Sequence, residues 1–220
     1  DMHTCAAVIA DVAYQPLMPM TEHKVSDARL CIKRAFDVVV SLIALLLFSP
    51  VYLLVALAVW STSRGPIFYR QERIGLHGIP FNIVKFRTMR IHAENDTPQL
   101  SLHNDPRVTR VGKILRKYRL DELPQFWNIL RGEMSIVGPR PERRYFINQI
   151  EEKAPYYCMI YKIRPGLTSW GPIKVGYTDT LEKMIRRLNY DIVYVENMSL
   201  GLDLKIMFYT LGVIFKGKGR

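Results

Sequence analysis

The chain has 220 residues, of which 49% are hydrophobic and 23% are charged, so it is neither intrinsically disordered nor collagen-like. Lysine and arginine number 31 against 20 aspartate and glutamate residues, which gives a formal net charge of +11 at pH 7. This excess indicates an anionic partner and leaves nucleic acid, anionic lipid and a phosphorylated substrate open. The sequence has no G-x-x-x-x-G-K-[ST] loop and no G-x-G-x-x-G turn, so it gives no support for a P-loop ATPase or a Rossmann domain.

Residues 1–28 show little hydrophobic periodicity and contain Pro16, Pro19 and Glu22. We interpret them as an N-terminal tail, or as the end of a linker from a longer parent chain. The sequence does not choose between these two interpretations.

A run of 23 uncharged residues, Val38 to Trp60, comes next. As a helix it is about 35 Å long, enough to cross a hydrocarbon core of about 30 Å. Ser49-Pro50 lies near its middle, where the proline kinks the helix and the serine hydroxyl is available to a freed carbonyl. Because basic residues flank the run on both sides, the positive-inside rule places both ends in the cytoplasm. We predict that residues 29–63 form a re-entrant membrane helix hairpin, with a kinked spanning helix as the competing interpretation.

Residues 64–220 are expected to form a small, helix-dominated domain of mixed α+β class. Strands are predicted at 66–69 and 81–86, joined by a turn region rich in glycine and proline. Helices are predicted at 111–120, 142–153, 181–187 and 200–215. The last one is amphipathic and is expected either to cap the core or to lie on the membrane interface. Its apolar face consists of Leu204, Met207, Phe208, Leu211 and Phe215.

A further helix is predicted to start at Asp121, because aspartate is a preferred N-cap and Pro124 then falls in the first turn. Gly132 is expected to follow its C-terminus. The expected apolar face consists of Leu123, Phe126, Trp127 and Leu130.

Asp121 and Glu122 lie among many basic residues. Their spacing alone favours a helix cap with surface salt bridges. The functional alternative is a carboxylate nucleophile, because aspartate can form an acyl phosphate and a helix N-terminus favours both its ionised form and an incoming phosphate. Glu122 would then act as a base or as a second oxygen near a metal, and hard oxygen ligands suit Mg²⁺ rather than zinc.

The segment Gly138-Pro139-Arg140-Pro141 encloses an arginine between two prolines. A helix-breaking turn explains the prolines but not the arginine, whereas a preorganised guanidinium suits bidentate capture of phosphate. Other basic residues are candidates to extend such a pocket, each with ordinary surface charge as the alternative. The candidate substrate-binding residues are Lys85, Arg87, Arg116, Pro139, Arg140 and Pro141.

Taken together, these segments resemble the bacterial sugar transferases, the monotopic polyprenyl-phosphate phosphoglycosyl transferases that begin glycan assembly. The matching motifs are KRAFDVVVS from Lys33, FSP from Phe48, PIFYRQERIG from Pro66, KFRTM from Lys85, DPRVTRVGKILRKYRLDELPQFWNILRGEMSIVGPRPE from Asp105, and RPGLT from Arg164. Each motif is weak alone, but their collinear order over most of the chain is highly specific.

The resemblance implies a membrane-dipping helix, interfacial amphipathic helices and a catalytic domain, residues 64–220, on the cytoplasmic face of the bacterial inner membrane. It implies that Asp121 attacks the sugar-linked phosphate of a UDP-sugar, which expels UMP and leaves a phosphosugar-aspartate. A polyprenyl phosphate such as undecaprenyl phosphate then takes the phosphosugar, with Glu122 as the proton acceptor. Mg²⁺ is the implied cofactor with Asp121 as its protein ligand. Arg116 and Arg140 are the implied phosphate or nucleotide contacts.

The implied role is the first membrane step of exopolysaccharide, capsule, O-antigen or glycoprotein glycan synthesis. The implied partners are the UDP-sugar donor, the polyprenyl phosphate acceptor and anionic membrane lipids, with no nucleic acid, and a homo-oligomer is compatible. One departure concerns Ser169, which follows the RPGLT motif where the family usually has glycine. This departure leaves the identity of the donor sugar open.

A second hypothesis from the residues is a membrane-anchored basic protein that binds anionic lipid or nucleic acid. The net charge of +11 supports it. An electrostatic surface, however, does not require the ordered run of motifs. Dependence on a metal and on Asp121 separates the two hypotheses, because a binding surface for anions tolerates the loss of one acid.

Overall fold

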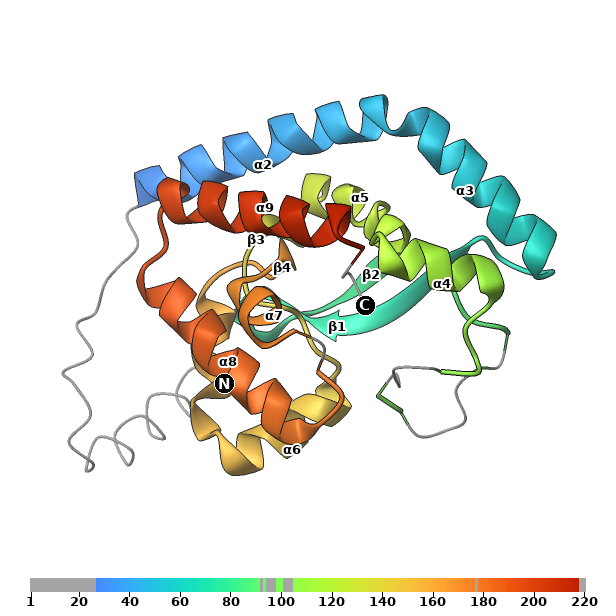
Figure 1. The fold of residues 1–220 in the computed structure, drawn as a ribbon. Coiled ribbons are helices and arrows are strands. Elements are labelled where there is room, and N and C mark those ends of the chain that lie inside the picture. The colour runs from blue at the N-terminus through green and yellow to red at the C-terminus, as the bar shows by residue number, and fades with distance from the viewer. Residues whose placement is uncertain (1–26, 92, 94–97, 101–104, 177, 218–220) are drawn as a thin grey trace.

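The computed structural model describes residues 27–91, 93, 98–100, 105–176 and 178–217. The helices are α2 Asp27–Leu47, α3 Ser49–Thr62, α4 Arg110–Lys117, α5 Gln125–Leu130, α6 Arg144–Lys153, α7 Trp170–Val175, α8 Leu181–Glu196 and α9 Leu200–Phe215. Short 3₁₀ helices are η1 Leu76–Gly78, η2 Leu120–Glu122 and η3 Pro155–Lys162, and the strands are β1 Phe68–Ile74, β2 Pro80–Phe86, β3 Ser135–Val137 and β4 Gly166–Thr168. The helix-dominated α+β prediction is therefore confirmed (Figure 1). The tail predicted at the N-terminus lies, as far as residue 26, outside the described residues.

Helices α2 and α3 form an apolar pair bent by 61°. The bend has the predicted cause, because Pro50 has no N–H for the carbonyl of Leu46 and the Ser49 hydroxyl donates to that carbonyl instead, at 2.8 Å. Among the described residues, no single helix has the length and hydropathy to cross a membrane, while this bent pair does by length and composition.

The basic residues in front of the apolar run are turned into the protein. Lys33 Nζ on α2 lies 2.6 Å from Asp203 Oδ2 on α9, and Arg34 donates to two carbonyls at the C-terminal end of α5. On α3, the Tyr52 hydroxyl donates to the carbonyl of Leu123 at 2.6 Å. These contacts fasten both arms of the bent pair to the domain beneath it.

The predicted strands form an antiparallel hairpin in which Tyr69 faces Lys85 and Arg73 faces Phe81. Residues that lie opposite each other in such a pair share a face of the sheet, and alternate residues along one strand share it too. Polar side chains of β1, at Gln71 and Arg73, therefore lie on the same face as Lys85. The second sheet is the short parallel pair β3–β4, which joins the segment before Pro139 to the segment before Ser169.

Helix α5 differs from its prediction in both its start and its buried face. It begins at Gln125, and its buried residues include Asn128, whereas Trp127 is exposed. Asn128 Oδ1 accepts from the N–H of Val84 at 3.0 Å, and its Nδ2 donates to the carbonyl of Asn82 at 2.7 Å. The face is polar because it satisfies backbone groups along the free edge of β2.

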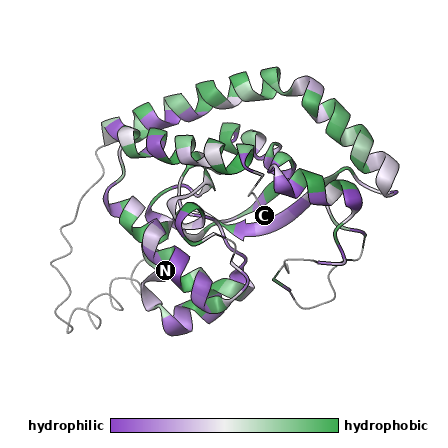
Figure 2. Ribbon diagram, in the orientation of Figure 1, coloured by the Kyte–Doolittle hydropathy of each residue, from purple (hydrophilic) through white to green (hydrophobic). Residues whose placement is uncertain are grey.

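Helix α9 has the predicted bounds, but its apolar side faces outward. Phe208 and Phe215 are 81% and 82% exposed, while Asp203 and Ile206 are buried. Hydrophobic residues likewise cover much of the outer side of α2 and α3 (Figure 2). Met207 packs against the core, whereas Leu204, Phe208, Leu211 and Phe215 are exposed, so α9 does not cap the core with the whole of its apolar face.

Candidate active site

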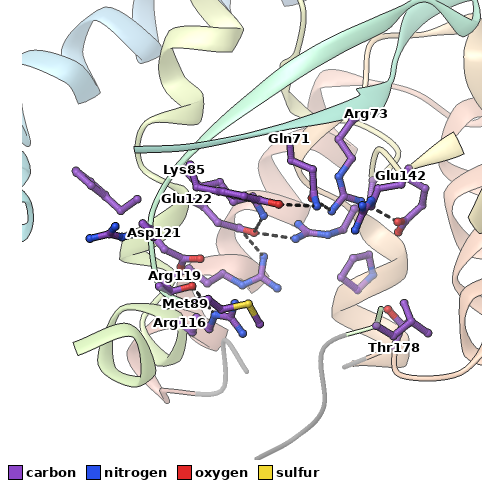
Figure 3. Close-up of a pocket in the computed structure, with 18 of the residues that line it drawn as sticks. Gln71, Arg73, Lys85, Met89, Arg116, Arg119, Asp121, Glu122, Glu142 and Thr178 are labelled. Carbon is purple, nitrogen blue, oxygen red and sulfur yellow. Dashed lines mark hydrogen bonds and ion pairs between the residues drawn. The ribbon is translucent and has the colours of Figure 1, made fainter. Parts of the chain in front are cut away.

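A cleft of about 640 Å³ opens between the β1–β2 hairpin, η2, the start of α6 and helices α7 and α8 (Figure 3). Among the residues that the structure describes, nine basic side chains line it against three carboxylates, which are Asp121, Glu122 and Glu142. Such an excess of positive charge at partly buried positions suits a ligand with several negative charges, such as a diphosphate.

Asp121 and Glu122 lie on the short turn η2 instead of starting a helix. Arg119, just before it, has a left-handed backbone with φ 54° and separates η2 from α4. Pro124 has no N–H to bond the carbonyl of Leu120, so the stretch continues as tight turns in which Leu123 N–H donates to Leu120 and Phe126 N–H to Leu123. The prediction that a helix begins at Asp121 is therefore wrong, because α5 begins at Gln125.

Glu122 is held by three cations. Its Oε1 lies 2.7 Å from Arg140 Nη2 and 3.3 Å from Lys85 Nζ, and its Oε2 lies 3.6 Å from Arg119 Nη1. Burial by itself would raise the pKa of this carboxyl, but Arg140, Lys85 and Arg119 outweigh burial and hold the pKa well below its usual value. Glu122 is thus a carboxylate that is ionised at neutral pH and pairs with the cations around it (Figure 3).

Asp121 is as buried as its neighbour, with both residues 8% exposed, but its carboxylate forms no ion pair or side-chain hydrogen bond with any described residue. Burial, followed by the charge of Glu122, raises the pKa of Asp121, while Lys85 and Arg116 act in the opposite direction. Arg116 is oriented by Thr88, whose Oγ1 accepts from its Nε at 2.8 Å. Asp121 is therefore a desolvated carboxylate with cations near it and none bound to it.

The Pro-Arg-Pro segment presents only its arginine to the cleft. Pro139 and Pro141 are buried, and their carbonyls accept from the N–H of Gly166 at 2.9 Å and from Arg73 Nη1 at 3.1 Å. The two prolines therefore shape the loop, and neither is among the described residues that line the cleft. Arg140 carries the guanidinium that reaches Glu122.

The remaining predicted contacts divide into two groups. Lys85 and Arg116 lie beside the carboxylates, as described above. Arg87 also lines the cleft, but its guanidinium donates to the carbonyls of Ser63 and Arg64 at the end of α3. This engagement makes Arg87 a link between the helix pair and the hairpin.

Sequence analysis missed a second charged group in the cleft. Glu142 Oε2 lies 2.9 Å from Arg73 Nη1, its Oε1 pairs with Arg187 of α8, and Arg73 also donates to Gln71 Oε1 at 2.7 Å. The alternation of Tyr69, Gln71 and Arg73 would have revealed part of this group if the predicted strand had been extended to Ile74. Arg187 gave no such signal, because helix α8 is brought to the cleft by the tertiary fold.

Among the described residues, no group of three or more histidine, cysteine, aspartate or glutamate side chains could hold a metal ion. Mg²⁺ usually binds through one or two carboxylates together with phosphate oxygens of a substrate. Of the three carboxylates in the cleft, Glu122 and Glu142 are engaged by cations and Asp121 is not. The residues present therefore fit Mg²⁺ held by Asp121 and a bound diphosphate.

Fold and cleft together define a small α+β domain, fastened beneath a bent apolar helix pair, with a cationic cleft suited to phosphorylated ligands. The model of the bacterial sugar transferase family matches residues 28–217, and the chain belongs to this family.

Among its relatives is the UDP-glucose:undecaprenyl-phosphate glucose-1-phosphate transferase of Klebsiella pneumoniae, 43% identical over 92% of this chain and 43% of that protein. The UDP-N-acetylgalactosamine-undecaprenyl-phosphate N-acetylgalactosaminephosphotransferase of Aeromonas hydrophila is 41% identical over 86% of this chain and 44% of that protein. The exopolysaccharide production protein ExoY of Rhizobium meliloti (strain 1021) is 40% identical over 85% of this chain and 87% of that protein. The chain thus spans less than half the length of the first two relatives.

Proposed function

We propose that this protein transfers a sugar 1-phosphate from a UDP-sugar to undecaprenyl phosphate and releases UMP. The names of the relatives support the substrate classes. The single observation that carries the proposal is the contrast within the dyad, where Glu122 pairs with three cations and Asp121 is buried near cations without a partner among the described residues. A desolvated, unpaired carboxylate next to an anion-binding cluster is what a nucleophile for phosphorus requires.

In the first half-reaction the donor diphosphate binds among Lys85, Arg116 and Arg140. A carboxylate oxygen of Asp121 attacks the phosphorus that carries the sugar, and the bond from that phosphorus to the bridging oxygen breaks. The electron pair leaves with UMP, and Asp121 becomes an acyl phosphate that carries the sugar. Arg140 is already oriented by Glu122 before the donor arrives, so little reorganisation accompanies the transfer.

In the second half-reaction an oxygen of the acceptor phosphate attacks the same phosphorus and displaces the Asp121 carboxylate. The product is a polyprenyl diphosphate sugar. The acceptor phosphate can enter as the dianion, because its second pKa lies near neutrality. Glu122 has a depressed pKa and is a weak base, so we assign it the ordering of Arg140, Lys85 and Arg119 in place of the proton-acceptor role that the resemblance implied.

Asp121 would hold Mg²⁺ together with the diphosphate, and the ion would supply positive charge that offsets the charge of the phosphates. The protein contributes in two ways. The turn η2 orients Asp121, and competing cations are kept away from its carboxylate. Glu122 achieves this exclusion, because it takes up the three neighbouring cations itself.

We further propose that the bent pair α2–α3 is re-entrant and that the domain sits on the cytoplasmic face of the bacterial inner membrane. The exposed apolar sides of α2, α3 and α9 support this placement. It brings the cleft close to the headgroup level, where the phosphate of a lipid acceptor lies. The reaction would then be the first membrane step of exopolysaccharide, capsule, O-antigen or glycoprotein glycan synthesis.

The test is UMP release by the protein in nanodiscs, given Mg²⁺, undecaprenyl phosphate and a panel that includes UDP-glucose, UDP-galactose and UDP-N-acetylgalactosamine. We expect release with at least one donor. Asp121→Asn should reduce it by at least 10³-fold, an effect on the order of the loss of a nucleophile. Asp179→Asn, which removes an exposed carboxylate, is the matched control and should leave the rate unchanged.

Without acceptor, the peptide that contains Asp121 should gain the mass of one hexose phosphate in the wild type and not in Asp121→Asn. UMP release that survives in Asp121→Asn would overturn the nucleophile. Lipid or nucleic-acid binding without UMP release from any donor would favour the basic binding protein instead.

A further inference from the structure

One buried carboxylate outside the dyad connects two walls of the cleft. Asp191 of α8 is 2% exposed, and its Oδ1 accepts from the hydroxyl of Ser169 and from the N–H of Gly171, the latter at 2.9 Å. Its Oδ2 accepts from the N–H of Arg140 at 3.2 Å. A single side chain thus holds both the Pro-Arg-Pro segment and the start of α7, residues 169–171, which we call the 169–171 turn.

The hydrogen bond from the Arg140 N–H to Asp191 cannot be replaced by one from a neighbouring amide of the loop. Pro139 and Pro141 carry no N–H, so the Arg140 amide is the one backbone donor between them. This amide lies at the base of the side chain whose guanidinium bonds to Glu122 at 2.7 Å. Moving the backbone at Arg140 would therefore move the guanidinium that pairs with Glu122.

The other wall is fixed as tightly. A Cβ on Gly171 would come within 2.4 Å of Arg187 Cγ and 2.8 Å of Asp191 Oδ1, so only glycine permits this approach to α8. Thr168, Pro172 and Ile173, on either side of this turn, line the cleft. Ser169 is not among the described residues that line the cleft, and its hydroxyl is directed to Asp191.

We propose that Asp191 is a positioning residue that locks the Arg140 loop to the 169–171 turn and thereby sets the cleft for the transfer reaction, with Ser169 as an accessory donor. The proposal rests on the proposed function for its effect on rate, but the lock itself is independent of activity. It assigns the Ser169 hydroxyl to the lock and not to selection of the sugar.

The lock is tested by hydrogen exchange of Asp191→Asn in nanodiscs. Because the two prolines have no amide hydrogen, overlapping peptides across 139–141 report the Arg140 amide alone. We expect this amide to exchange at least tenfold faster in Asp191→Asn, because the asparagine can offer an acceptor oxygen to only one of the two walls. Asp203→Asn is the matched control, since it neutralises a buried carboxylate that contacts neither wall, and it should leave the Arg140 amide unchanged.

The effect on rate is tested by a double-mutant cycle with Arg140→Lys. Asp191→Asn should lower kcat for UMP release about 10- to 100-fold in the wild type and less than about threefold in the Arg140→Lys background. Asp203→Asn should have equal effects in both backgrounds. Ser169→Gly should change kcat less than about threefold and leave the ranking of donors unchanged.

Multiplicative effects of Asp191→Asn and Arg140→Lys would overturn positioning through Arg140. If the Arg140 amide exchanged in Asp191→Asn at the same rate as in the wild type, the lock itself would be overturned. A wild-type protein that releases no UMP from any donor would instead refute the proposed function, and the exchange result would still decide the lock.

Discussion

Asp121 and Glu122 are adjacent carboxylates on one short turn, but they differ in their contacts with the neighbouring cations. Glu122 takes the direct contacts of Arg140, Lys85 and Arg119, and Asp121 receives only their field at longer range. Burial without a counter-ion is unfavourable for a charged carboxylate, so Asp121, the proposed nucleophile, is kept in a state that the fold alone does not favour. This is the usual compromise between stability and activity at a reactive site.

Asp121→Asn should therefore stabilise the protein while it abolishes UMP release. The pKa of Asp121 is raised above 3.8, so its contribution to stability is complete below pH 3.8 and is lost as the pH rises through the folded-state pKa. We expect the variant to gain about 1 kcal/mol, or about 2–4 °C in Tm, at pH 7.5 and to lose this advantage below about pH 4. Thermal unfolding at both pH values measures it. An Asp121→Asn Tm below that of the wild type at pH 7.5 would contradict the unpaired state of the carboxylate.

Glu122→Gln should have the opposite effect. It removes the centre that three cations share and leaves them buried side by side, a loss of about 3 kcal/mol. The depressed pKa of Glu122 means that its stabilising contribution is present above pH 4.5 and is lost as the pH falls through the lower folded-state value. Urea unfolding at neutral pH should show the loss, and Asp179→Asn serves as an exposed-carboxylate control. A change under 1 kcal/mol would mean that Glu122 does not order the cluster.

The helix bend depends on one proline and one tether. Pro50 frees the Leu46 carbonyl, Ser49 satisfies it, and Tyr52 fastens the second arm to the carbonyl of Leu123, next to the dyad. The helix pair that we propose to be re-entrant therefore also supports the turn that carries Asp121 and Glu122.

Pro50→Ala should restore the missing helical hydrogen bond and shift the pair toward a straight, spanning helix. Cysteines placed at Arg29 and Ser61, in a background without the native cysteines, would report the sides of the membrane on which the two ends lie. We expect both ends to be cytoplasmic in the wild-type sequence and a fraction of the Ser61 end to become periplasmic in Pro50→Ala. The further substitution Tyr52→Phe should enlarge that fraction. Two cytoplasmic ends in both variants would refute a decisive role for the proline.

Local sequence patterns predicted most helices and strands, whereas the geometry of the site depends on contacts between residues far apart in the sequence. The bounds of α9, Leu200–Phe215, follow from a periodicity that is contained in the segment itself. The turn at Asp121 could not be predicted in the same way, because it depends on the left-handed Arg119 and on tight turns around Pro124. Glu122 pairs with Lys85 and Arg140, which lie 37 and 18 residues away in the sequence. The sequence analysis identified both residues as candidate phosphate contacts, but it could not predict that they pair with Glu122.

At the scale of the whole molecule, the apolar surface and the cationic cleft meet at α9. Its outward side carries Phe208 and Phe215, whereas Thr210 and Val213 of the same helix line the cleft. A lipid whose hydrocarbon lies along the outer surface could therefore present its phosphate to the cleft over a short distance. In the membrane placement that we propose, α9 would couple attachment to the membrane with access of the acceptor.

Replacing Phe208 and Phe215 together by aspartate should weaken this coupling. We expect the KM for undecaprenyl phosphate to rise about tenfold or more, since two exposed aromatic anchors are each worth on the order of 1–2 kcal/mol at an interface, while the KM for the UDP-sugar changes little. Val193→Asp, at an exposed apolar position of α8, is the control and should alter neither value. Equal rises in both KM values would indicate damage to the fold and not loss of an acceptor path.

The assembled site also predicts how Mg²⁺ binds. Because Asp121 is the one cleft carboxylate without a cation among the described residues, the protein alone offers Mg²⁺ few ligands, and the donor must bring the others. Calorimetry should show weak binding of Mg²⁺ to the protein alone and binding about tenfold tighter in the presence of UDP. Asp121→Asn should remove this coupling, and EDTA should stop UMP release without lowering the Tm. Tight binding of Mg²⁺ without nucleotide, or a Tm that falls in EDTA, would show a site built by the protein alone and would displace Asp121 as the metal ligand.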